Sequence, residues 1–320
     1  MKRHFFRLSC AVLSVYLSAA AVFARELIPV GQIIGLELSA GTVTVAAFDD
    51  SLTVARDSGL QVGDQILSID DNSIACAEDV RQALKHSDGA VEMTVSRNGK
   101  AQQIHMEPEI TATGPKLGIY LKQGITGIGT VTYYDPETGQ FGTLGHGVND
   151  SRGDLLPMTR GNVYPASIVS VQKGKAGAPG QLKGTLKSEQ LLGSLTGNTA
   201  RGVFGKVSTG WQGAALPAGA SEAVRLGPAS IRSTVDSRGP REYSVEILKI
   251  YPKSRADGRN LLIRITDPTL LEATGGIVQG MSGSPIIQDG KLVGAVTHVL
   301  VNDPTRGYGI FIENMLEAAG

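Results

Sequence analysis

The sequence has few cysteines and few aromatic residues. Of its 320 residues, two are cysteines and 5% are aromatic, and Trp211 is the single tryptophan. Cys10 lies in the N-terminal segment described below, and Cys76 stands alone in the rest of the chain. An internal disulfide is therefore excluded.

Metal-ligand patterns are absent as well. The histidines beyond residue 24 are His86, His105, His146 and His298. No two of them have the spacing of a metal-binding motif, so we expect no metal and no cofactor.

The chain carries no excess of charge. The formal net charge is zero, and residues 1–24 contain three of the 30 Lys and Arg residues, which leaves 27 basic against 30 acidic residues beyond them. A nucleic-acid-binding surface is not indicated. Glycine is abundant at 41 residues, which favours short strands and turns over long helices, and the length suits about two domains.

The N-terminal segment has the features of a targeting signal. Lys2, Arg3 and Arg7 precede an uncharged, largely apolar run over 8–22, and Val22-Phe23-Ala24 is an acceptable cleavage site. The run is also near the lower limit for a membrane span. We expect residues 1–24 to be a signal peptide or an N-terminal anchor, so that the protein is exported and either secreted or held at the outer face of the membrane through residues 8–24.

Residues 27–110 are predicted to form a small α+β domain. The stretch from Ala55 to Asp70 reads A-x-x-x-G-L-x-x-G-D-x-I-L-x-I-D, and Val80 and Leu84 share one face of a short helix. This pattern resembles a PDZ domain, which implies that an extended peptide or a C-terminus is bound as an added strand. The resemblance places the carboxylate-binding loop at Ile33, Ile34, Gly35 and Leu36. A plain spacer domain is the alternative.

The stretch Gly280-Met281-Ser282-Gly283-Ser284-Pro285 predicts a nucleophile. Glycines on both sides of Ser282 allow a sharp turn and a close approach to a ligand. The backbone N–H groups of Gly280 and Ser282 would then form an oxyanion hole. An apolar hairpin with Asp289-Gly290 at its turn follows, and together these features resemble chymotrypsin-like serine proteases. An ordinary Gly/Ser-rich surface turn is the alternative.

His146 is the candidate general base. It lies between Gly145 and Gly147 at the end of a predicted strand, and histidine is the commonest base near neutral pH. An orienting carboxylate is harder to choose from the residues alone. The candidates are Asp267, Asp150, Asp154 and Asp135.

Several motifs together resemble the SpoIVB peptidase family of endospore formers. They are Gly127-Ile128-Gly129-Thr130, Phe141–Gly147, Ile265–Pro268, Gly275–Pro285 and Gly294–Thr305. The resemblance implies a serine peptidase with a catalytic triad of Ser282, His146 and Asp267. It also implies export from the forespore into the intermembrane space, and cleavage both of itself and of a regulatory membrane protein. That second cleavage activates an intramembrane protease, which processes a late sigma factor in sporulation.

The sequence thus predicts a mainly β protein in which the PDZ domain (27–110) is followed by a chymotrypsin-like double β-barrel serine protease domain (114–320). We expect the substrate backbone to pair with Thr297, His298 and Val299, with His298 either touching substrate or serving as an ordinary strand residue. Two alternatives stay open. One is a quality-control protease of the HtrA kind, in which the PDZ domain follows the protease instead; the other is an inactive PDZ scaffold or adaptor.

Overall fold

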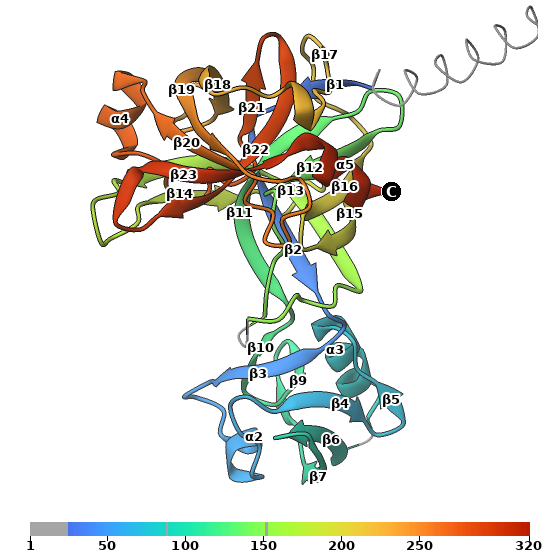
Figure 1. Ribbon diagram of the computed structural model, residues 1–320. Helices are drawn as coiled ribbons and strands as arrows, with labels where there is room; N and C mark the ends of the chain where they lie inside the picture. Colours follow the sequence, from blue (N-terminus) through green and yellow to red (C-terminus); the bar gives the residue numbers. More distant parts are fainter. Residues whose placement is uncertain (1–24, 88, 151–152) are drawn as a thin grey trace, which may run out of the picture. The chain divides into compact units, whose positions relative to one another are not determined.

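The computed structural model describes residues 25–87, 89–150 and 153–320. The predicted signal peptide or anchor, residues 1–24, lies outside the described residues. The chain forms two compact units (Figure 1). The smaller unit comprises residues 37–126 and 157–161, and the larger unit holds the rest. Within the described part of the chain, no helix is both long and apolar enough to cross a bilayer.

The smaller unit is a sheet with two helices, α2 (Val54–Asp57) and α3 (Ala77–Lys85). The sheet order is β10-β3-β4-β6-β7, with β5 paired to β4, and β8 and β9 form a separate hairpin. The strands are β3 (Val43–Phe48), β4 (Gln65–Ile69), β5 (Asn72–Ser73), β6 (Val91–Arg97), β7 (Lys100–Met106), β8 (Glu109–Thr111), β9 (Gly114–Lys116) and β10 (Ile119–Lys122).

Local sequence signals explain these elements. Asn98 and Gly99 have φ values of 52° and 77°, as a two-residue turn requires, and they join β6 to β7. Helix α3 begins where the Cys76 N–H donates to the Asp79 carboxylate at 2.9 Å, and its buried residues include the predicted Val80 and Leu84. The apolar face of α3 therefore completes the core of this unit.

The larger unit begins with a ring of six strands in the order β12-β16-β15-β13-β2-β11, which the pairing of β11 with β12 closes. Its strands are β2 (Ile33–Ser39), β11 (Ile125–Tyr134), β12 (Gln140–Thr143), β13 (Arg160–Gln172), β15 (Gly193–Thr199) and β16 (Gly202–Val207). Three further strands, β1 (Glu26–Pro29), β14 (Gln181–Leu186) and β17 (Leu216–Pro217), extend it.

A second closed barrel follows, in the order β18-β19-β20-β23-β22-β21. Its strands are β18 (Gly227–Ser233), β19 (Arg241–Ile250), β20 (Leu261–Ile265), β21 (Pro285–Gln288), β22 (Lys291–Leu300) and β23 (Asp303–Phe311). The helical segments are η2 (Ser221–Ala223), α4 (Pro268–Thr274) and α5 (Ile312–Ala319). Apolar side chains from all six strands fill the core, and the predicted double β-barrel is confirmed.

The unit boundaries differ from the predicted domains 27–110 and 114–320. Strand β1 pairs with β11 and β17, and β2 lies between β13 and β11 in the first barrel. Residues 26–36 therefore belong to the larger unit, and the smaller unit is inserted between β2 and β11. The sequence pattern could not reveal this, because a short apolar strand carries no mark of its distant partner.

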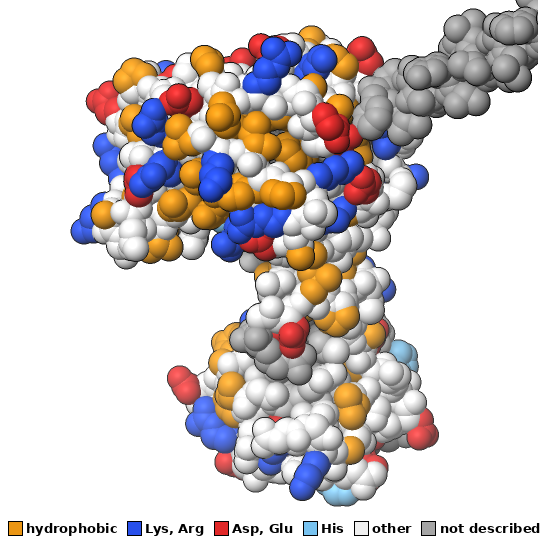
Figure 2. All heavy atoms as spheres, in the orientation of Figure 1, with side chains coloured by type: hydrophobic (Ala, Val, Ile, Leu, Met, Phe, Trp, Pro, Cys, Tyr) orange, Lys and Arg blue, Asp and Glu red, His pale blue; other side chains and the backbone are white. Residues whose placement is uncertain are grey.

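Charges of both signs are spread over the visible surface. Figure 2 shows Lys and Arg side chains interspersed with hydrophobic and acidic ones on this face of the larger unit. In the larger unit as a whole, the exposed large hydrophobic residues include Leu155, Val169, Leu191, Leu226 and Val301.

Candidate active site

The turn that carries Ser282 is fixed against the first barrel. Gly280 and Gly283 have φ values of 98° and 96°, and a Cβ on Gly283 would collide with the carbonyl oxygen of Thr130 on β11. Thr130 donates its N–H to the Ser282 carbonyl at 3.1 Å and its hydroxyl to the Gly280 carbonyl at 2.7 Å. The Thr132 hydroxyl donates to the Gly283 carbonyl at 2.7 Å. The nucleophile turn of the second barrel is thus tied to one strand of the first.

Sequence reasoning missed the two threonines. Their signal is the alternation Thr130-Val131-Thr132, three residues of β11 that are all fully buried. A buried hydroxyl requires a hydrogen-bond partner, and here the partners are the carbonyls of the nucleophile turn.

The Ser282 side chain is partly buried, and its hydroxyl donates a 2.7 Å hydrogen bond to the carbonyl oxygen of Thr297 on β22. Among the described residues, the hydrogen bonds of Ser282 do not include one to His146. The hydroxyl must therefore leave Thr297 to transfer its proton to an imidazole.

The backbone of the turn contains unpaired donors. The N–H groups of Met281, Gly283 and Ser284 donate to backbone carbonyls. Within residues 25–87, 89–150 and 153–320, those of Gly280 and Ser282 donate to no acceptor. These two amides are the predicted oxyanion hole, and they are free to bind an anionic oxygen.

His146 follows β12 through a strained turn. Leu144 and Gly145 have φ values of 67° and 68°, and a left-handed backbone is unusual for leucine. The His146 Nδ1 lies 2.9 Å from the Gly147 carbonyl oxygen. When Nδ1 carries the proton and donates it there, Nε2 is left as the acceptor, which is the tautomer a general base needs. Burial lowers the pKa of His146 below its ordinary value.

Asn198 fixes the segment after His146, and sequence reasoning missed this residue as well. Its side chain accepts from the Val148 N–H at 2.9 Å, and donates to the carbonyls of Val148 at 2.8 Å and Leu156 at 3.0 Å. No local pattern distinguishes this asparagine from a surface one, because its partners are about 50 residues away in sequence.

The structure brings His146 and His298 together. Their ring centroids are 5.1 Å apart and the rings are inclined at 43°. The His298 Nδ1 is buried and, among the described residues, has no hydrogen-bond partner. Burial lowers the pKa of His298 to about 4, with the charges of His146 and Arg259 acting in the same direction and that of Asp257 opposing them.

Asp267 does not contact His146. It is the N-cap of α4: one carboxylate oxygen accepts the Leu270 N–H at 3.0 Å and the other accepts the Ser244 N–H at 3.4 Å. Among the hydrogen bonds of the described residues, none joins Asp267 to either histidine. Asp267-Pro268 is a strong helix-start signal, because Asp caps the first turn and Pro fits its first position.

Two of the other candidate carboxylates, Asp135 and Asp150, bind other partners. Asp135 forms an ion pair with Arg25 at 2.6 Å and accepts the Glu137 N–H. Asp150 accepts the N–H of Asp154 at 3.1 Å. The carboxylate of Asp257, which was not considered from the sequence, is the one whose charge acts on His298, and it is paired with Arg255 at 2.7 Å.

Among the described residues, no group of three or more His, Cys, Asp or Glu side chains could hold a metal ion.

The predicted carboxylate loop of the small domain is misplaced. Ile33, Ile34, Gly35 and Leu36 lie in β2 and are buried in the larger unit, so this placement does not fit the structure. The edge strands of this sheet are instead β10 and β7. Of these, β10 follows Leu117-Gly118, and Tyr120 on it is 59% exposed.

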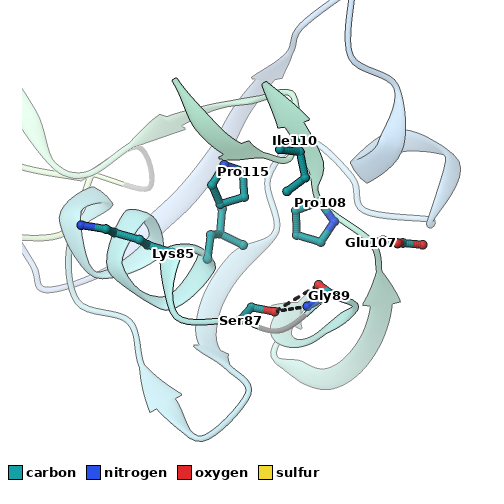
Figure 3. A pocket seen from close by; sticks show the side chains of 8 residues that line it. Lys85, Ser87, Gly89, Glu107, Pro108, Ile110 and Pro115 are labelled. Atoms are coloured by element: carbon teal, nitrogen blue, oxygen red, sulfur yellow. Dashed lines mark hydrogen bonds between the residues drawn. The ribbon is translucent and has the colours of Figure 1, made fainter. Parts of the chain in front are cut away.

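A cavity of about 410 Å³ lies beyond the end of α3 in the smaller unit (Figure 3). Its lining is apolar at Leu84, Pro108, Ile110 and Pro115, and Lys85 and Glu107 stand at its rim. Ile110 is 79% exposed.

Two family models match this chain. The family described as SpoIVB peptidase S55 matches residues 114–316, and a PDZ domain matches residues 53–97, which confirms both resemblances. No curated protein matches the chain.

Solved structures resemble the chain only distantly. One is "HtrA-type protease AlgW with decapeptide", with a TM-score of 0.38 and 15% identity over 62% of this chain. This chain covers about half (53%) of the AlgW chain. Another is the inactive form of the Rv3671c protease, from M. tuberculosis H37Rv, with a TM-score of 0.34 and 15% identity over 61% of this chain and 85% of that one.

Proposed function

Because the chain belongs to the SpoIVB peptidase S55 family and carries a PDZ domain, we propose that it is an exported serine endopeptidase with Ser282 as nucleophile and His146 as general base. One observation carries the proposal. Two consecutive residues of β22 contact the two reacting groups, since the Thr297 carbonyl accepts the Ser282 hydroxyl and the His298 ring lies against the His146 ring.

The reaction is peptide-bond hydrolysis. The Ser282 hydroxyl turns from Thr297 to the His146 Nε2, loses its proton there, and attacks the scissile carbonyl. His146 then returns the proton to the leaving amine, and a water molecule hydrolyses the acyl-enzyme by the same path. The free N–H groups of Gly280 and Ser282 bind the oxyanion in both steps.

The resemblance assigns the orienting carboxylate to Asp267. In the structure this carboxylate caps α4, so the role requires Asp267 to leave the Leu270 and Ser244 amides and His146 to release the Gly147 carbonyl. Asp267 is proposed as the orienting carboxylate on the family resemblance alone.

The substrate is proposed to be a protein. We propose that the enzyme cleaves itself and the extracytoplasmic part of a membrane-bound regulator, and so activates the intramembrane protease that processes a late sigma factor in sporulation. Membership of the family supports this role. Substrate backbone would pair along Thr297, His298 and Val299.

The PDZ domain is proposed to bind a peptide or a C-terminus at the β10 edge. The open position of β10 in the sheet supports strand addition there.

A fluorophosphonate probe tests the activity. It labels a serine only when the hydroxyl is activated, so we expect labelling of the wild type and none of Ser282→Ala. Ser237→Ala is the matched control, because Ser237 is an exposed serine of the same barrel. Labelling that persists in Ser282→Ala would refute the assignment of the nucleophile.

A PDZ scaffold without activity is the second candidate. It is favoured by the hydrogen bond that holds the Ser282 hydroxyl on Thr297 and by the separation of Asp267 from His146. Absence of labelling in the folded wild type would support it.

A further inference from the structure

His298 is the group in contact with the general base. The two rings lie 5.1 Å apart and are inclined at 43°. In the part of the chain that the structure describes, His146 has one hydrogen bond, from its Nδ1 to the carbonyl of the adjacent Gly147. That bond restrains the Nδ1 edge of the ring, and the His298 ring is the other contact that the structure shows. The contact with His298 therefore limits the orientation of Nε2.

A shift in the strand pairing of β22 determines where His298 lies. In the pairing of β22 with β23, Val296 lies opposite Gly309 and His298 lies opposite Tyr308, so the register shifts at Thr297. A bulge of this kind redirects side chains, and bulges often occur beside active sites. Here it sets the Thr297 carbonyl against the Ser282 hydroxyl and the His298 ring against His146.

The His298 ring has an unused polar atom. Its Nδ1 is buried and has no partner among the described residues, although buried polar atoms are nearly always hydrogen-bonded. A neutral imidazole can accept an N–H from a neighbouring imidazolium, and its π-face also attracts a cation. The ring is therefore suited to stabilise His146 after His146 has taken the serine proton.

Resting on the proposed function, we propose that His298 is a positioning residue for His146, which holds the imidazole in the orientation that Ser282 needs and stabilises its protonated form. The groups that face His298 are His146, Arg259 and Asp257. Asp267 is occupied at the start of α4, so His298 is the side chain that contacts the base in this arrangement.

The test uses the full chain and the variants His298→Ala and His298→Gln. His105→Gln is the control, because His105 is exposed in the other unit. We expect His298→Ala to slow fluorophosphonate labelling at least about tenfold, a part of the gain that general base catalysis supplies. We also expect the acid limb of the rate to move to lower pH, because protonated His146 loses the neighbouring ring that stabilises it. His298→Gln should restore part of the rate. A merely structural role would lower the unfolding temperature without moving the limb.

A second measurement does not depend on activity. Titration of the ¹⁵N-labelled imidazoles by NMR in Ser282→Ala follows His146 with and without His298. We expect the His146 titration to shift to lower pH in Ser282→Ala/His298→Ala, and a shift to higher pH would contradict the proposed stabilisation. An unchanged titration, or labelling of His298→Ala within twofold of the wild type, would overturn the proposal. Should the wild type fail to label, the proposed function fails, while the titration still decides the contact.

Discussion

The Ser282 hydroxyl donates to the Thr297 carbonyl at 2.7 Å. The hydroxyl of the nucleophile is therefore bound to a backbone carbonyl, which is too weak a base to take its proton. It becomes reactive only when its hydrogen bond moves to an imidazole. Both ends of that exchange lie within one unit, because the Ser282 turn, β22 and His146 all belong to the larger unit. The proposed exchange of hydrogen bonds thus takes place within one compact unit.

The pH dependence of activity reports His146. The base must be neutral, and burial holds its pKa below the ordinary value. We expect the rate of labelling by the probe to be constant at neutral pH and to fall on the acid side, with its midpoint below about pH 6.5. A midpoint above about pH 6.5, or a rate that does not fall on the acid side while the protein stays folded, would contradict His146 as the base.

Acid should also destabilise the fold through His298. The pKa of His298 is about 4 in the folded chain and about 6.5 in the unfolded chain. The unfolded state takes up the proton first, so stability is lost as the pH falls from about 6.5 to 4. We expect the unfolding temperature of the wild type to drop more over this range than that of His298→Gln. His105→Gln is the control and should follow the wild type. Equal slopes for wild type and His298→Gln would contradict the buried, neutral ring.

Gly283→Ala tests the fit of the nucleophile turn. The added Cβ would collide with the Thr130 carbonyl at a residue whose φ is 96°. We expect a loss of more than about 2 kcal/mol in unfolding free energy by urea denaturation, together with loss of probe labelling.

Gly290→Ala is the matched control for that change. Gly290 has a φ of 71° and nothing lies near its Cβ position, so only backbone strain of about 1 kcal/mol is expected. Equal costs at the two glycines would show that the contact with Thr130 is unimportant.

Substitutions of Asp267 separate a helix cap from a catalytic carboxylate. Asp267→Ala removes the acceptor for the Leu270 N–H and should cost about 1 kcal/mol of stability, whereas Asp267→Asn can still cap α4. If Asp267 orients His146 during the reaction, Asp267→Asn should lower turnover by about 10⁴-fold with the fold intact. Turnover near that of the wild type would show that Asp267 only caps α4, and that His298 alone orients His146.

The sequence was sufficient for features that depend on local chemistry. The α3 face at Val80 and Leu84 and the glycine-flanked turn at Ser282 were both predicted, because each depends on residues a few positions apart. Features that depend on distant pairing were not. Three of these features join segments more than about 80 residues apart. They are the place of β2 in the first barrel, the hydrogen bonds of Thr130 and Thr132 to the Ser282 turn, and the contact of His146 with His298.

Asp267 shows the limit in another way. A motif match fixes which residue resembles a family's carboxylate, but only coordinates show what that carboxylate touches. Here it touches the first turn of a helix.

The insertion of the PDZ domain between β2 and β11 has a consequence for the lifetime of the enzyme. A barrel whose first strands precede the inserted domain cannot be separated from that domain by one cut: a fragment starting at residue 114 would lack β1 and β2 and could not close its ring. Trimming ahead of Arg25 would keep its ion pair with Asp135 and both first strands, whereas a cut within 40–124 that released the N-terminal piece would remove β1 and β2. If the chain cleaves itself as proposed, the position of the cut peptide bond decides whether the cut matures the protein or inactivates it irreversibly.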